Sequence, residues 1–240
     1  MTISGFLIIH TSSNIMESEC ISNNQEQFQI QEKEVEKVVK RSATKEDILS
    51  ILLFIKIDEN KFLSKVVINP IKNDVLVEGI SFNLLVTHNT RKKNLHEIYD
   101  YGGIRLLHKI INEQLHHNLT KYVYIQSKNN LENILDILGS IEIKKDNIFG
   151  FGETNSEEKY YIMDSKRAMD LLNNEQLDFL QKEKVFNKLI KEYILQKLQA
   201  IESSAGELTF KELINNINSN ISYLDFCKLR ETIIINESSN

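Results

Sequence analysis

Short apolar runs separated by turn residues mark the strands in the first half of the chain. Residues 51–55 are continuously apolar and rich in strand-forming types, which is typical of a buried strand. Residues 62–68 and 75–77 give two more strands, and the segment 69–74 between them supplies turn residues. This spacing predicts a hairpin, and residues 84–86 are expected to continue its second strand.

Apolar residues three and four positions apart predict helices that alternate with the strands. The first helix is expected directly after the glycine pair Gly102-Gly103. A second helix is expected between Ser127, a typical N-cap, and Gly139, a typical C-cap. Asp164 is the predicted N-cap of a third helix.

The remaining elements follow from the same patterns. Strands are predicted at 122–125, 141–143, 160–163 and 232–235, the longest helix at 175–202, and short helices at 164–172, 209–218 and 222–229. Residues 149–155 are predicted to form a hairpin tip. Because strands and helices alternate throughout, one layered α/β domain is favoured over two separate domains.

The first 47 residues differ from the rest of the chain. Residues 12–48 are mostly polar, so we interpret residues 1–47 as a tail or linker and residues 48–240 as the domain. The apolar run at 5–9 is too short for a signal-peptide core, and the chain has no complete transmembrane helix. The run would fit the last turn of a membrane helix that begins upstream.

Charge and cysteine content narrow the choice of partners. The chain has 29 basic and 34 acidic residues, a formal net charge of −5, which disfavours a nucleic-acid partner. The local basic run at 91–93 is interpreted as a solvated loop. Cys20 and Cys227 are too few for a disulfide framework, and Cys227 is expected in the core.

Five segments share their order and spacing with a known family. They are residues 51–58 ending at an aspartate, 66–70 ending in Asn-Pro, 99–103 (Tyr-Asp-Tyr-Gly-Gly), 135–139 (Leu-Asp-Ile-Leu-Gly) and 217–222. Together they resemble the LytR-CpsA-Psr family, whose members transfer glycopolymers from a polyprenyl-pyrophosphate carrier to the bacterial cell wall. The resemblance covers residues 48–236. It implies a mixed central β-sheet flanked by helices, with an apolar tunnel for the lipid.

The residues that carry the family's chemistry differ in this chain. Displacement at a pyrophosphate needs positive charge on the phosphoryl oxygens, from arginines and a metal ion. Where the family has an arginine and an aspartate, the aligned residues are Phe82 and Asn83, and a family lysine aligns within residues 94–96. Among the residues aligned with the later arginine motifs, Lys182 is the only basic one, and lysine lacks the bidentate fork.

Three hypotheses follow from the resemblance. The leading one is a degenerate member that has lost phosphotransferase activity and binds a polyprenyl-linked lipid or an envelope partner. The alternative is a divergent, active glycopolymer–peptidoglycan phosphotransferase of a Gram-positive bacterium, with Asp58 holding Mg²⁺ and Asp58 and Lys182 as catalytic candidates. Phosphate would then be bound by Lys61, Lys92, Lys93 and Arg105. The third hypothesis is a protein-interaction module without a pocket.

The resemblance also implies a place and a ligand class. Such a protein acts outside the cytoplasmic membrane, in the cell envelope, on polyprenyl (pyro)phosphate lipid or cell-wall glycopolymer. The histidines at 96, 108, 116 and 117 lack the helical spacing of a zinc site and are interpreted as surface residues.

Overall fold

The protein is described by a computed structural model, which covers residues 40–144, 160–198 and 204–232. These residues belong to one compact unit that begins at Val39. In this part of the chain no helix has both the length and the hydropathy that a membrane span requires.

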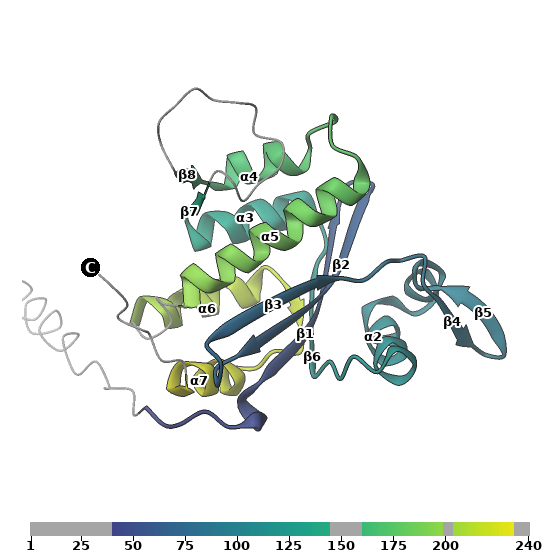
Figure 1. Cartoon of the computed structure of the whole chain (residues 1–240), viewed down its shortest axis with the longest axis horizontal. Coiled ribbons are helices and arrows are strands. Elements are labelled where there is room, and N and C mark those ends of the chain that lie inside the picture. The colour runs from purple at the N-terminus through teal and green to yellow at the C-terminus, as the bar shows by residue number, and fades with distance from the viewer. Residues whose placement is uncertain (1–39, 145–159, 199–203, 233–240) are drawn as a thin grey trace, which may run out of the picture. The chain divides into compact units, whose positions relative to one another are not determined.

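A mixed β-sheet forms the centre of the unit (Figure 1). Its strand order is β3-β2-β1-β6-β9, with bounds β1 Leu49–Ile57, β2 Asn60–Asn69, β3 Asp74–Gly79, β6 Lys121–Ile125 and β9 Asn218–Ser219. Strand β1 pairs antiparallel with β2 and parallel with β6, and β2 continues antiparallel into β3. The hairpin and the mixed sheet are therefore confirmed.

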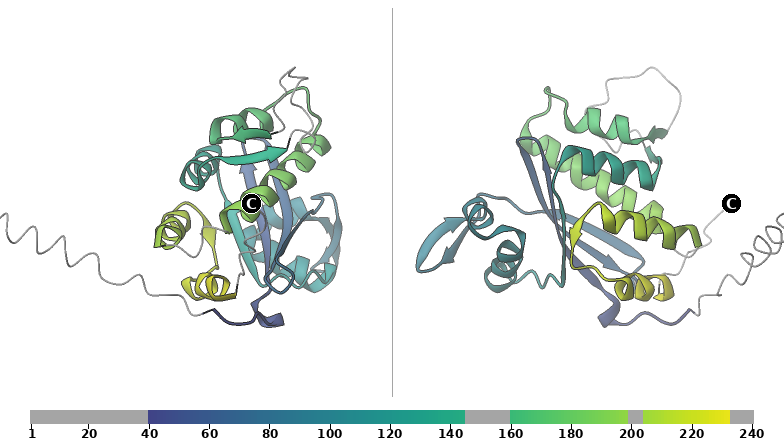
Figure 2. Two further views of the ribbon diagram at one scale, coloured as in Figure 1. Left: turned by 60° about the vertical axis from the view of Figure 1, so that its left-hand side comes forward. Right: turned by 180° about the vertical axis from the view of Figure 1, so that it is seen from behind.

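Both faces of the sheet are covered by helices, so β1 is buried on both sides (Figures 1 and 2). One face carries α3 Lys128–Leu138, α4 Ser165–Leu172, α5 Phe179–Leu198, α6 Ser204–Asn215 and α7 Tyr223–Thr232; the other carries α2 Leu95–Leu115. Because side chains alternate along a strand, Leu53 and Ile55 enter the first core while Leu52 and Phe54 enter the second.

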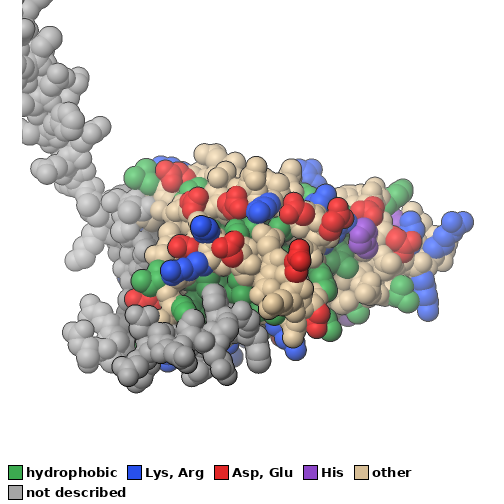
Figure 3. All heavy atoms as spheres, turned by 90° about the horizontal axis from the view of Figure 1, so that it is seen from above, with side chains coloured by type: hydrophobic (Ala, Val, Ile, Leu, Met, Phe, Trp, Pro, Cys, Tyr) green, Lys and Arg blue, Asp and Glu red, His purple; other side chains and the backbone are tan. Residues whose placement is uncertain are grey.

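The segment after β3 forms a separate hairpin of β4 Leu85–His88 and β5 Arg91–Asn94. The predictions that residues 84–86 extend the third strand and that 91–93 form a loop were wrong. Asn89 and Thr90 both have positive φ, 49° and 67°, which gives a two-residue turn that reverses the chain. Lys and Arg side chains gather at the end of the unit formed by this hairpin (Figure 3).

The helix predicted after the glycine pair is confirmed, with Ile104, Leu107 and Ile110 buried, but α2 also includes an earlier helical segment that begins at Leu95 and was not predicted. Asn94 accepts a hydrogen bond from the backbone N–H of Glu97 (2.8 Å), and the Glu97 carboxylate accepts from the N–H of Asn94 (2.9 Å). This capping box starts the helix early. Gly103, at φ 66° and ψ −166°, then kinks the helix in a conformation that suits glycine.

The capping predictions further along the chain are confirmed. Ser127 accepts from the N–H of Asn130, and Asp164 accepts from the N–H of Arg167. Gly139 ends α3 at φ 70°. Short-range chemistry therefore fixes these helix ends.

In the second half of the chain the predicted strand pair is confirmed, but the bounds of the long helix and the last predicted strand differ from the structure. Strands β7 Ile141–Lys144 and β8 Tyr160–Met163 pair as expected, whereas the predicted tip at 149–155 lies outside the described residues. The predicted helix at 175–202 begins only at Phe179, where the side chain of Asp178 accepts from the N–H of Gln181. Thr232 ends α7 instead of starting a strand; residues 233–235 of that predicted strand lie outside the description.

Neither cysteine is part of the core that the structure describes. Cys227 lies on α7 and is half-buried rather than in the core, and Cys20 falls outside the described residues.

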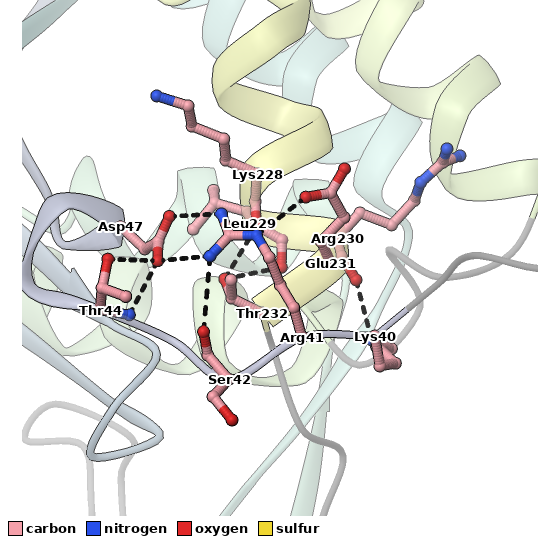
Figure 4. A network of polar contacts seen from close by, with 10 residues as sticks. All are labelled: Lys40, Arg41, Ser42, Thr44, Asp47, Lys228, Leu229, Arg230, Glu231 and Thr232. Atoms are coloured by element: carbon pink, nitrogen blue, oxygen red, sulfur yellow. Dashed lines mark hydrogen bonds and ion pairs between the residues drawn. The ribbon is translucent and has the colours of Figure 1, made fainter.

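A polar network joins the entry segment to α7 (Figure 4). Arg41 donates to both carboxylate oxygens of Asp47, at 2.8 and 2.7 Å, and its Nε donates to Glu231 at 3.1 Å. The same carboxylate accepts from the N–H and the hydroxyl of Thr44. Since the Asp47 side chain is only 3% exposed, these contacts compensate a nearly buried charge.

Replacing Asp47 by Asn is expected to lower the free energy of unfolding by about 2 kcal/mol at neutral pH. Hydrogen bonds from Arg41 hold the pKa of the Asp47 carboxyl far below its usual range. The contribution is therefore complete above the unfolded pKa of about 4 and declines as the pH falls toward the folded pKa. Urea unfolding of both proteins from pH 7 to pH 3 should show the difference narrowing below about pH 4. A difference independent of pH would contradict this assignment.

Candidate functional site

An apolar cavity of about 410 Å³ lies between the sheet and helices α3, α5 and α6. Leu53 and Ile55 of β1 form its floor, Ile134 of α3 one wall, and Ile190 and Ile194 of α5 the other. The 3.6-residue spacing of apolar residues on α3 and α5 points these side chains inward.

The charged group and the phenol at the cavity wall form hydrogen bonds within the protein. Among the described lining residues Lys197 is the only charged one, and its Nζ donates to the carbonyl of Ser140 at 2.8 Å. The Tyr193 hydroxyl donates to the carbonyl of Met163, and burial raises the pKa of Tyr193 to about 12. The cavity therefore suits a hydrocarbon ligand.

The cavity volume fits a chain of limited length. An apolar cavity of about 150 Å³ accepts one benzene molecule, so 410 Å³ corresponds to roughly 15 carbons. That is about three five-carbon prenyl units. A longer chain would have to extend beyond the cavity.

An aromatic cluster, defined by Phe54, Phe82, Tyr99 and Tyr124, lies on the opposite face of the sheet. Phe54 stacks on Tyr124 at 4.9 Å and meets Phe82 and Tyr99 edge-on at 5.4 and 4.7 Å. The hydroxyls of Tyr99 and Tyr124 lie 2.6 Å apart, and burial raises the pKa of Tyr99. Phe82, at the aligned position of a family arginine, is thus part of a neutral packed cluster.

Lys61 is paired within the protein, beside the aromatic cluster. Its Nζ lies 2.8 Å from Nε2 of His96 and 3.8 Å from a carboxylate oxygen of Asp100. Nδ1 of His96 lies 2.8 Å from the other Asp100 oxygen. Lys61 therefore has a carboxylate partner, which weakens it as a phosphate ligand. Sequence reasoning missed this partner because it started α2 after the glycine pair, beyond both His96 and Asp100.

The other site candidates lie on several different elements. Asp58 is exposed in the β1–β2 turn at φ 49°, Lys182 is half-buried on α5, Lys92 and Lys93 lie on β5, and Arg105 is exposed on α2. No ion pair or hydrogen bond joins any two of these candidates within the described residues. In the same part of the chain, no group of three or more His, Cys, Asp or Glu residues is arranged to hold a metal ion.

The residue next to Lys182 on α5 is acidic. Its neighbour Glu183 packs against Gly79, where an added Cβ would lie only 2.5 Å from the Glu183 carboxylate. Burial raises the pKa of Glu183. Nearby, the Ser64 hydroxyl donates to the side-chain carbonyl of Asn187 at 2.6 Å. A half-buried carboxyl and a neutral amide oppose the binding of a pyrophosphate here.

No family model and no curated protein matches the chain. Among solved structures, a transcriptional regulator, EF0465 from Enterococcus faecalis, superposes with a TM-score of 0.61 at 16% identity, covering 78% of this chain and 71% of that chain. TagU of B. subtilis superposes with a TM-score of 0.55 at 16% identity, covering 78% of this chain and 82% of that chain. The structure of TagT bound to LI-WTA superposes with a TM-score of 0.54 at 14% identity, covering 82% of this chain and 80% of that chain. TagU and TagT are LytR-CpsA-Psr enzymes.

This chain has a LytR-CpsA-Psr-like fold. At these identities the likeness establishes the fold alone. The LytR-CpsA-Psr-like fold thus contains an apolar cavity on one face of the sheet and an aromatic cluster around Phe54 and Phe82 on the other.

Proposed function

We propose that this LytR-CpsA-Psr-like domain binds the hydrocarbon chain of a prenyl-type lipid in the cell envelope, without the phosphotransfer reaction of the family. The apolar cavity carries this proposal. Its size and its nearly uncharged lining match a prenyl chain. Each CH₂ group of the chain that leaves water for the cavity adds about 0.8 kcal/mol to the binding free energy. TagT, a structural neighbour, has been seen bound to LI-WTA, which supports an envelope ligand.

The arrangement of charges argues against turnover. A transferred pyrophosphate needs several positive groups aimed at its oxygens. Here Phe82 is packed among aromatic rings, Lys61 is paired with Asp100, and Glu183 adds a carboxyl near Lys182. Each lost charged hydrogen bond removes roughly 1.5–3 kcal/mol, so the loss of several would suppress catalysis strongly.

Extraction of the purified full chain tests the lipid proposal. The protein is expressed in a bacterial host, extracted with organic solvent, and the extract is analysed by mass spectrometry. We expect a prenyl-chain lipid in near-equimolar amount, or uptake of farnesyl phosphate when it is added afterwards. Failure of both would contradict the proposal and favour an interaction module without a bound ligand.

A separate assay tests the absence of phosphotransfer. The protein is incubated with Mg²⁺ and a polyprenyl-pyrophosphate-linked sugar, and release of the sugar phosphate is followed. We expect no release above the rate without protein. Mg²⁺-dependent release that both Asp58→Ala and Lys182→Ala abolish would instead favour the divergent enzyme.

A further inference from the structure

The apolar cavity contacts only the C-terminal half of helix α5. The residues of this helix that line it are Ile190, Tyr193, Ile194, Lys197 and Leu198. Lys182, which aligns with the later arginine motifs of the family, is not among them and lies about 22 Å before Lys197 along the helix, at ~1.5 Å per residue. A ligand that fills the cavity therefore contacts Lys197 and does not reach Lys182.

The two ends of the cavity differ in polarity. At one end the cavity is lined by Leu138, in the last turn of α3, and by Lys197, in the last turn of α5. At the other end the start of α3 meets the end of α6, where the Asn130 side chain donates to the carbonyl of Asn216 at 3.4 Å. The lining residues there are Leu131 and Leu213. One end therefore carries a cation and the other end is apolar.

The ammonium group of Lys197 is held in place but not neutralised. Its Nζ donates to the carbonyl of Ser140 at 2.8 Å, and a lysine ammonium has further N–H donors. No carboxylate among the described residues forms an ion pair with Lys197, and the nearby carboxylate of Asp136 accepts from the Ser165 hydroxyl. Because this cation is half-buried and lacks a carboxylate partner, an anionic group beside it would gain a charge-assisted hydrogen bond.

We propose that Lys197 binds the phosphate group of a prenyl phosphate whose chain fills the apolar cavity. The inference rests on the proposed lipid-binding function and adds the ligand's charge and orientation. The phosphate lies at the ends of α3 and α5 and accepts hydrogen bonds from Lys197, while the chain runs toward Leu131 and Leu213. An uncharged prenyl alcohol would bury the same chain but gain nothing from the ammonium group.

Paired binding measurements with farnesyl phosphate and farnesol test the inference. Equilibrium dialysis of the full chain against each labelled ligand gives the two dissociation constants. Lys197→Gln is expected to weaken binding of farnesyl phosphate about tenfold, the effect of one lost charged hydrogen bond, and to leave binding of farnesol unchanged. Lys197→Arg keeps the positive charge and should retain most of the affinity for farnesyl phosphate.

Lys184→Gln is the matched control, because Lys184 is exposed on the same helix and does not line the cavity. It should bind both ligands like the original chain. If the original chain binds neither ligand, the lipid function and this inference fail together. If it binds both, unchanged affinity for farnesyl phosphate in Lys197→Gln, an equal loss for both ligands in that variant, or a loss in Lys182→Gln instead would overturn the inference alone.

Discussion

Replacing Ile194 by Trp is expected to weaken binding of farnesyl phosphate roughly 50-fold. Ile194 lines the apolar cavity from α5 and is half-buried, so a larger side chain enters space that the ligand needs. A tryptophan would displace about three CH₂ groups of the chain, at about 0.8 kcal/mol each, which corresponds to this factor. Native mass spectrometry of the protein with increasing farnesyl phosphate measures the change.

Leu208→Trp is the matched control for this variant. Leu208 lies on α6, is 63% exposed, and is not among the described residues that line the cavity. We expect unchanged binding in this variant and a folded protein in both, as judged from thermal melts. Wild-type affinity in Ile194→Trp, or an equal loss in Leu208→Trp, would show that the ligand binds elsewhere.

Replacing Phe54 by Ala is expected to lower the free energy of unfolding by about 3–5 kcal/mol. Phe54 is fully buried at the centre of the aromatic cluster and contacts the rings of Phe82, Tyr99 and Tyr124. For a domain of this size the loss corresponds to a fall in Tm of roughly 10 °C. Because Phe54 enters the core beside α2, farnesyl phosphate binding should change little.

Tyr99→Phe separates packing from hydrogen bonding in the same cluster. It removes only the hydroxyl contact with Tyr124, so the expected loss is about 1 kcal/mol. Chemical unfolding of both variants measures the two losses in the free energy of unfolding, and Phe54→Ala should show the larger one. A loss below 1 kcal/mol for Phe54→Ala would contradict the view that the cluster stabilises this end of the sheet.

Local signals in the sequence were sufficient for most of the fold. Ser127, Gly139 and Asp164 mark helix ends because capping depends on residues within one turn. The continuous apolar run of β1 indicated a strand buried on both faces, and the structure confirms this.

The errors arose where one local signal drew attention from another or where the usual signal was missing. The glycine pair drew attention to the helical segment that follows it, and the segment that begins at Leu95 was missed, although Asn94 and Glu97 form a capping box that the sequence displays. The turn at Asn89 and Thr90 was missed because it lacks the glycine that usually marks a two-residue hairpin. With that turn unseen, the basic strand β5 was interpreted as a loop.

The site could be predicted only in part. Alignment of Phe82 with a family arginine already indicated a missing charge, and the structure adds that the ring is packed against Phe54. The pairing of Lys61 with Asp100 and the cavity itself depend on contacts between distant segments. Such contacts follow from the assembled sheet and helices and have no local signature.

Photo-crosslinking tests the central claim most directly. The protein is incubated with a farnesyl phosphate analogue that carries a photoreactive group on its chain, irradiated, digested and analysed by mass spectrometry. The account predicts labels on the cavity-lining segments of α3 and α5, around Ile134, Ile190 and Ile194, and their loss in Ile194→Trp. Labels confined to α2 or to the β4–β5 hairpin would contradict it.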